Sequence, residues 1–204
     1  MGEFKLSDYS SDLVVLFLLL LLFSLMAVPR VEISVSSPWD AFYIHLLPWV
    51  LLIPLHEGLH TLTARLMGAR VRFGVTTIGR FNLTPYMAIE TPLPAGKYVL
   101  VSLSPLILSL VALSLAWLLH SAFWVLVYAY NTAGMAGDFV TALVLLRMPG
   151  DAEVFDDGIV LRSAEEIPRP YPVWVSSLLK VFAVIAFLLF LRLLFGRVDI
   201  VVEK

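Results

Sequence analysis

Residues 41–67 read AFYIHLLPWVLLIPLHEGLHTLTARLM, and this stretch decides how the chain folds. It is long enough to cross a lipid bilayer as a helix, which takes about 20 mostly apolar residues. Its interior nevertheless holds the ionisable side chains of His56, Glu57 and His60. Such side chains are costly inside a membrane and mark functional sites there. The stretch therefore predicts a membrane-embedded helix with a functional site in it.

The spacing of the two histidines predicts a metal site. Residues four apart lie on one face of a helix, so His56 and His60 can offer two imidazole nitrogens to one ion. Glu57 is then a neighbour of the ion, placed as a general base that accepts a proton from water at the metal. His-Glu-x-x-His (HExxH) is the pattern of zinc metallopeptidases, so we expect zinc (Zn2+) as the cofactor.

The composition is that of an integral membrane protein. Apolar residues make up 60% of the chain and charged residues 15%, and the mean hydropathy of +0.91 is far above that of a soluble domain. The net charge of −2 predicts no nucleic-acid partner. Cysteine is absent, so the metal ligands must be histidines and carboxylates. We expect the lipid bilayer to be a partner.

Five apolar segments divide the chain, and most have the length of a membrane-spanning helix. They are residues 13–28, 41–67, 98–119, 122–146 and 173–195. They predict an all-α membrane protein with about five transmembrane helices, forming one domain over residues 1–204. The first segment is either a retained anchor, which its flanks favour, or a signal peptide. Residues 1–4 are not used to decide between the anchor and the signal peptide.

Two connecting segments have the character of short β-hairpins. Residues 71–90 mix β-branched and aromatic residues with Gly74 and Gly79. Residues 152–163 place Asp156-Asp157-Gly158 between apolar pairs, which is a hairpin signal. The alternative is that both segments are polar surface loops. Basic residues gather around them, which predicts a multi-pass protein of the cell membrane with these loops and the N-terminus in the cytoplasm.

A catalytic zinc ion usually has three protein ligands, so a third ligand is needed. The carboxylates within the apolar segments are Glu57 and Asp138, and an aspartate in the membrane needs a cationic partner. His60 lies 10 residues before Arg70, and Asp138 lies 9 before Arg147. The second and fourth apolar segments cross the membrane in the same direction. At 1.5 Å per residue, His60 and Asp138 each lie about 13–15 Å from the basic residue that follows them. We expect Asp138 to be the third ligand.

Other residues remain candidates for parts of the site. Asn131 lies about two helical turns before Asp138, and it is either a catalytic oxyanion donor or the source of an interhelical hydrogen bond. The loop glutamates are ligands only if their loops fold back into the membrane; they are Glu90, Glu153, Glu165 and Glu166. His45 and His120 lie near the outer face and are expected to be interfacial.

The pattern of HExxH in one apolar segment and Asn131 and Asp138 in a later one resembles the site-2 protease class of intramembrane zinc metallopeptidases. The chain is more similar still to a family of zincin-type membrane peptidases known as a domain of unknown function. That resemblance also rests on Lys97-Tyr98, Ser104-Pro105-Leu106 and Gly137-Asp138. It implies that His56, His60 and Asp138 bind zinc, that Glu57 is the general base and that peptide bonds are cleaved in or near the membrane.

Two features depart from the site-2 protease pattern. Gly134 stands where that class carries a proline, and Gly137-Asp138-Phe139 replaces its Leu-Asp-Gly. The predicted function is hydrolysis of peptide bonds in membrane-associated or transmembrane polypeptides by a zinc-activated water. One alternative is a metal-binding membrane scaffold or chaperone without catalysis. Another is a metal-ion transporter, which the absence of an internal repeat disfavours.

Overall fold

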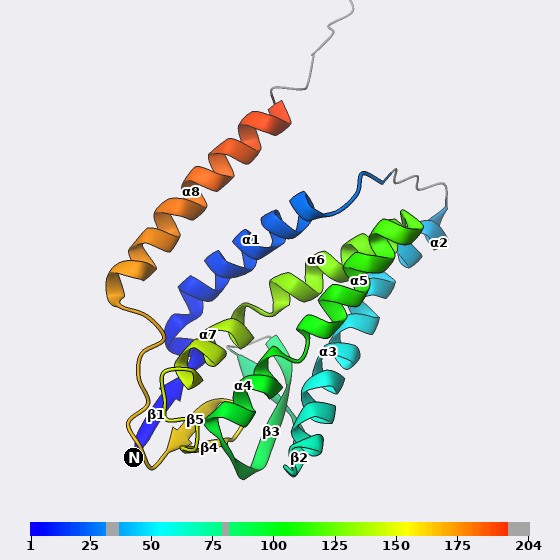
Figure 1. The fold of residues 1–204 in the computed structure, drawn as a ribbon. Coiled ribbons are helices and arrows are strands. Elements are labelled where there is room, and N and C mark those ends of the chain that lie inside the picture. The colour runs from blue at the N-terminus through cyan, green and yellow to red at the C-terminus, as the bar shows by residue number, and fades with distance from the viewer. Residues whose placement is uncertain (32–36, 79–81, 196–204) are drawn as a thin grey trace, which may run out of the picture.

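The computed structural model describes residues 1–31, 37–78 and 82–195, and it is mostly helical with one small sheet. Figure 1 shows long helices running side by side, with the sheet and two short helices gathered at one end. The helices are η1 (Leu6–Tyr9), α1 (Ser10–Ala27), α2 (Pro38–Ala41), η2 (Phe42–Leu46), α3 (Leu47–Leu66), α4 (Ala95–Leu103), α5 (Leu106–Leu119), α6 (Ala122–Gly134), α7 (Ala136–Leu145) and α8 (Val173–Phe195).

Three helical stretches of the described chain are long and apolar enough to cross a membrane. They are Leu6–Ala27, Pro38–Leu66 and Ala95–Leu119. Two shorter apolar helices accompany them, at Ala136–Leu145 and Val173–Leu189. These findings are consistent with a membrane protein, and the count of five spans stays a prediction.

Two of the apolar segments are broken, where the sequence predicted continuous helices over 98–119 and 122–146. The first break lies at Ser104 and Pro105, between α4 and α5. A proline inside a helix lacks an N–H donor and its ring clashes with the preceding turn, so the break has a local cause. The second break follows Gly134, a residue with low helix propensity, and separates α6 from α7.

The sheet has five antiparallel strands in the order β1-β5-β4-β3-β2. The strands are β1 (Gly2–Lys5), β2 (Val71–Ile78), β3 (Asn82–Pro94), β4 (Glu153–Asp156) and β5 (Val160–Ser163). Both predicted hairpins are therefore present, as a small antiparallel sheet in a protein that is otherwise mostly helical. The first strand was not expected. It pairs with β5, where Phe4 lies opposite Leu161, and forms one edge of the sheet.

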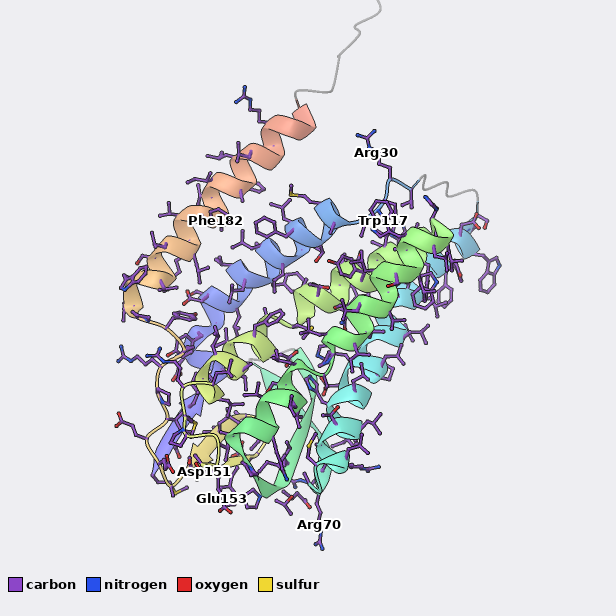
Figure 2. All side chains as sticks on the ribbon, in the orientation of Figure 1. Arg30, Arg70, Trp117, Asp151, Glu153 and Phe182 are labelled. Atoms are coloured by element: carbon purple, nitrogen blue, oxygen red, sulfur yellow. The ribbon has the colours of Figure 1, made fainter. Side chains whose placement is uncertain are left out.

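The main hydrophobic core lies where the sheet meets the helices. It joins buried residues of the strands, such as Ile89 and Val154, to Val101 of α4 and Val140 of α7. Charged side chains occupy the sheet end, whereas Arg30 and Trp117 lie at the opposite end of the bundle (Figure 2). There the Trp117 indole N–H donates to the last carbonyl of α1 at 3.1 Å.

The outer helix α8 packs against α1. Phe182, midway along α8 in Figure 2, stacks on Phe23 with ring centroids 6.2 Å apart. Nearer the sheet end, the buried Asp12 of α1 accepts hydrogen bonds from Ser176 at 2.7 Å and Tyr171 at 3.0 Å. Lys180 approaches the same carboxylate at 3.4 Å. Polar contacts thus fasten α8 to α1 on the side of the bundle away from α3.

Candidate metal centre

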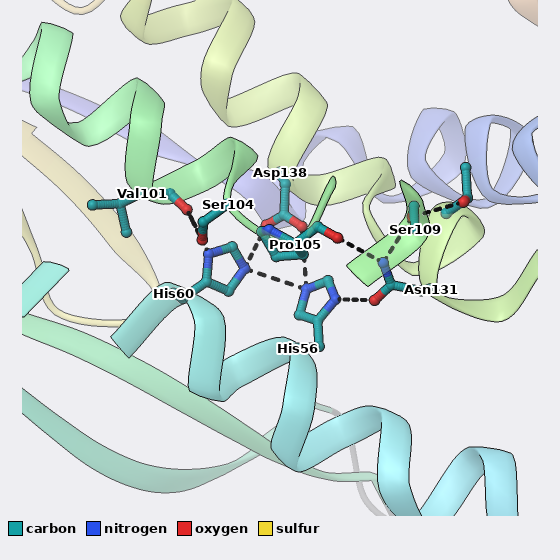
Figure 3. A network of polar contacts seen from close by, with 9 residues as sticks. His56, His60, Val101, Ser104, Pro105, Ser109, Asn131 and Asp138 are labelled. Carbon is teal, nitrogen blue, oxygen red and sulfur yellow. Dashed lines mark hydrogen bonds and ion pairs between the residues drawn. The ribbon is translucent and has the colours of Figure 1, made fainter. Parts of the chain in front are cut away.

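Two histidines of α3 and one aspartate of α7 converge at the level of the helix breaks. His56 and His60 lie one turn apart on α3, and their Nε2 atoms are 3.2 Å from each other (Figure 3). Asp138 lies in the first turn of α7. Its Oδ2 lies 3.2 Å from His56 Nε2, and its Oδ1 lies 3.3 Å from His60 Nε2. The structure therefore brings the three predicted ligands together.

Each imidazole is held through its other ring nitrogen. His60 Nδ1 lies 2.8 Å from the carbonyl oxygen of Val101 on α4. A carbonyl only accepts, so His60 must donate from Nδ1. His56 Nδ1 lies 3.0 Å from Oδ1 of Asn131 on α6. Partners of this kind fix the tautomer and orientation of a metal-binding histidine.

The orientation of Asn131 decides the tautomer of His56. The amide nitrogen of Asn131 donates to the carbonyl of Pro105 at 2.9 Å and to Ser109 Oγ at 2.8 Å. The amide oxygen therefore faces His56, whose Nδ1 must be the donor. Both N–H groups of this fully buried amide serve contacts between helices. These are the interhelical hydrogen bonds that the sequence offered as the alternative to an oxyanion donor.

The chemistry of these donor atoms fits a zinc ion. With both Nδ1 atoms protonated, the Nε2 atoms of neutral His56 and His60 carry lone pairs that face each other and a carboxylate. Oδ2 of Asp138 is buried and has no hydrogen-bond partner among the residues that the structure describes. Nitrogen and carboxylate donors in a set of three match a catalytic zinc site with one open position. A cation would satisfy all of these acceptors.

Glu57 lies beside the three ligand residues without joining them. It follows His56 on α3, is half-buried, and interacts electrostatically with His56, His60 and Asp138. Its backbone carbonyl accepts a hydrogen bond from Thr61 Oγ1 at 2.8 Å, a contact within the helix. A carboxylate in this place can exchange protons with water at the metal.

The remaining candidates lie away from this centre. Within residues 1–31, 37–78 and 82–195, His56, His60 and Asp138 are the one group of potential ligands that clusters tightly enough for a metal ion. The alternative third ligands are all exposed, namely Glu90, Glu153, Glu165 and Glu166. His45 and His120 are exposed as well.

Sequence reasoning did not assign roles to the groups that orient the imidazoles. The Val101 carbonyl is a backbone atom, which residue types do not reveal. Ser109, which holds Asn131, reads in the sequence as an ordinary helix residue. The signal that was available is Pro105, because a proline in an apolar segment frees the carbonyl four residues before it.

A buried pair ties the second hairpin to α4. The Tyr98 hydroxyl donates to Oδ2 of Asp156, and the Gly158 backbone N–H donates to Oδ1 at 2.7 Å. Burial raises the pKa of Asp156, and the hydrogen bonds from Tyr98 and Gly158 act in the opposite direction. Tyr98 lies three residues before Val101, so the pair anchors the helix whose carbonyl holds His60.

The comparisons with known proteins agree with this geometry. A protein from Pyrococcus woesei described as "Uncharacterized 24.7 kDa protein in gap 5'region" is 44% identical over 186 residues, which cover 91% of this chain and 84% of the relative. No solved structure matches the chain significantly. The family described as "Putative zincin peptidase" matches residues 49–152, a span that holds all three clustered side chains. The chain belongs to this zincin peptidase family.

Proposed function

We propose that this protein is an integral-membrane zinc endopeptidase that cleaves membrane-associated or transmembrane polypeptides. One observation carries the proposal. Two imidazoles with fixed tautomers and a carboxylate whose buried Oδ2 has no hydrogen-bond partner among the described residues converge among apolar helices. This donor set matches a catalytic zinc site. Membership of a zincin peptidase family supports the same reaction class.

The residues divide the chemistry between them. His56, His60 and Asp138 would hold zinc, which supplies Lewis acidity and makes water a good nucleophile near neutral pH. Glu57 accepts the proton of the attacking water and passes it to the nitrogen of the departing amine. Water is thereby added across the peptide bond. Asn131 acts on the site through His56, as a positioning residue.

The surroundings of the centre support a substrate that arrives from the bilayer. The metal-binding part of α3 has exposed apolar side chains, including Leu55 and Leu62, which are 48% and 55% exposed. In a membrane this face contacts lipid. We place the sheet end and the N-terminus in the cytoplasm, because Arg65 lies in the last turn of α3 and Arg70 and Arg147 follow α3 and α7 at that end. The protein is then a multi-pass protein of the cell membrane.

The free edge of the sheet is suited to hold a substrate in extended form. β2 is an edge strand, and it contacts α3, the helix that carries His56 and His60. A peptide bond inside a helix is shielded by its hydrogen bonds, so the substrate must unwind before it is cleaved. Pairing with an edge strand supplies replacement hydrogen bonds for the unwound segment. We infer that the substrate adds to β2.

Cross-linking tests this mode of binding. The chain contains no cysteine, so a single introduced cysteine is the one thiol in the protein. Phe73→Cys, at a position 57% exposed on β2, should form a disulfide with a cysteine placed near the cleavage site of a bound substrate. Ile159→Cys, 55% exposed at the turn before β5, is the control and should not. Equal cross-linking of the two variants would remove strand addition from the proposal.

Reconstituted protein tests the reaction itself. Protein in lipid vesicles should cleave a membrane-anchored reporter peptide, lose this activity in a chelator and regain it with one equivalent of zinc. His56→Ala should be inactive, whereas His120→Ala, an exposed histidine outside the cluster, should match the wild type. Cleavage that persists in the chelator, or in His56→Ala, contradicts a zinc peptidase.

A further inference from the structure

The break between α4 and α5 leaves one backbone carbonyl without its usual donor. In an α-helix each N–H donates to the carbonyl four residues earlier, and proline has no N–H. The carbonyl four residues before Pro105 is that of Val101. It accepts instead from His60 Nδ1 at 2.8 Å and from Ser104, whose hydroxyl lies at 2.7 Å and whose backbone N–H lies at 3.2 Å. The missing N–H of Pro105 thus leaves room for an imidazole.

The same proline orients the second imidazole through its own carbonyl. Pro105 O accepts the helical N–H of Ser109 at 3.2 Å and also the amide of Asn131 at 2.9 Å. That contact turns the amide oxygen of Asn131 towards His56 Nδ1, 3.0 Å away. Pro105 and Asn131 are among the most deeply buried side chains of the protein. Water is therefore a poor substitute for either hydrogen bond.

We propose that Pro105 is a positioning residue for the metal centre. Because it has no backbone N–H, the carbonyl of Val101 can accept a hydrogen bond from His60. Its own carbonyl accepts a hydrogen bond from Asn131, which in turn orients His56. One residue thereby sets the tautomer of both imidazoles with Nε2 free for a metal ion. The inference rests on the proposed function and adds a reason why the helix is broken at the depth of the site.

Pro105→Ala is the direct test, made in the full chain in detergent. The restored N–H competes with His60 for the Val101 carbonyl, and the helix gains a favourable residue. We expect zinc affinity to fall about 10- to 100-fold, the usual effect of losing a partner behind a metal-binding histidine. The unfolding temperature of the metal-free variant should not fall. If Pro105 served only in packing, Pro105→Ala would instead lower the unfolding temperature, and the folded variant would bind zinc with normal affinity.

Three further variants accompany this test. Ser114→Ala removes a hydroxyl of α5 that donates to the carbonyl of Leu110 at 2.8 Å and leaves the N–H of position 105 missing, so its zinc affinity should equal that of the wild type. Asn131→Ala removes the partner of His56 without touching the break, and its zinc affinity should fall about 10- to 100-fold. Thr132→Val is its matched control, because Thr132 hydrogen-bonds to Ser109 and not to a histidine.

Nitrogen-15 NMR of the histidine rings gives a readout that does not depend on zinc. The chain has four histidines, so their signals can be assigned by single substitutions. Metal-free wild type should show His56 and His60 with the proton on Nδ1, and Pro105→Ala should show a mixture of tautomers for His60. Unchanged tautomers and zinc affinity in Pro105→Ala overturn the inference about Pro105. If the wild type shows the expected tautomers but binds no zinc, the proposed function is overturned and the inference about Pro105 is not.

Discussion

Replacing Asp138 with alanine should reduce zinc affinity by more than about 100-fold, since loss of an outer partner alone costs 10- to 100-fold. Asp138 contributes the one carboxylate of the cluster, and its Oδ2 has no hydrogen-bond partner among the described residues. Wild-type protein purified without chelators should carry about one zinc per chain. Mass spectrometry of the metal content, followed by competition with a chromophoric chelator, measures both quantities.

The matched control for this variant is Asp151→Ala. Asp151 is exposed at the sheet end and lies outside the cluster, so its removal should leave the metal content unchanged. His56→Ala should lose zinc as Asp138→Ala does. Zinc retained at full affinity by Asp138→Ala would assign the third ligand to another residue. A wild type that holds no metal after reloading with zinc would contradict the metal site altogether.

Glu57→Gln should retain zinc and lose peptidase activity by about 10²- to 10⁴-fold, the usual contribution of a general base. The substitution keeps the size of the side chain and removes its ability to take up a proton. Because Glu57 is not among the clustered donor atoms, zinc affinity should stay within a few-fold of the wild type. Single-turnover cleavage of the reporter peptide, with zinc content measured on the same sample, separates the two effects.

This variant also separates an enzyme from a metal-binding scaffold. A scaffold needs the zinc site but no proton acceptor, so a cellular function that survives Glu57→Gln and is lost in Asp138→Ala would favour the scaffold. Glu153→Gln, at an exposed position on β4, controls for the change of charge. Full peptidase activity in Glu57→Gln would assign the general base to a different group.

The grouping of the three clustered side chains was predictable because the free-energy cost of burying ionisable groups leaves few arrangements. An apolar segment tolerates an ionisable group only where it finds a partner, so His56, His60 and Asp138 had to meet one another. The similar distances of His60 from Arg70 and of Asp138 from Arg147 along the sequence indicated a similar depth in the membrane. The two hairpins followed from β-branched residues and from a turn at Asp157-Gly158. The catalytic and zinc-binding roles themselves stay predictions.

The parts that sequence reasoning missed depend on contacts between distant backbone atoms. β1 forms because it pairs with β5, which lies far along the chain. Its four residues are too few to show the alternation of apolar and polar residues from which a strand is predicted. The breaks at Pro105 and after Gly134 interrupt segments whose hydropathy is uniform, and hydropathy does not report helix continuity. The position of the His60 imidazole depends on the backbone carbonyl of Val101, to which only Pro105, four residues later, points in the sequence.

The pairing of β1 with β5 and the place of Asp138 on α7 have a consequence for the order in which the protein is completed. Synthesis delivers His56 and His60 to the membrane long before Asp138, and β1 is made well before β5, its partner. A chain still attached to the ribosome holds two imidazoles without their carboxylate until α7 has been synthesised. The sheet is completed later still, when β5 has been synthesised. If the proposed function holds, the order of the three side chains in the sequence means that the protein can become an active peptidase only after most of it has been translated.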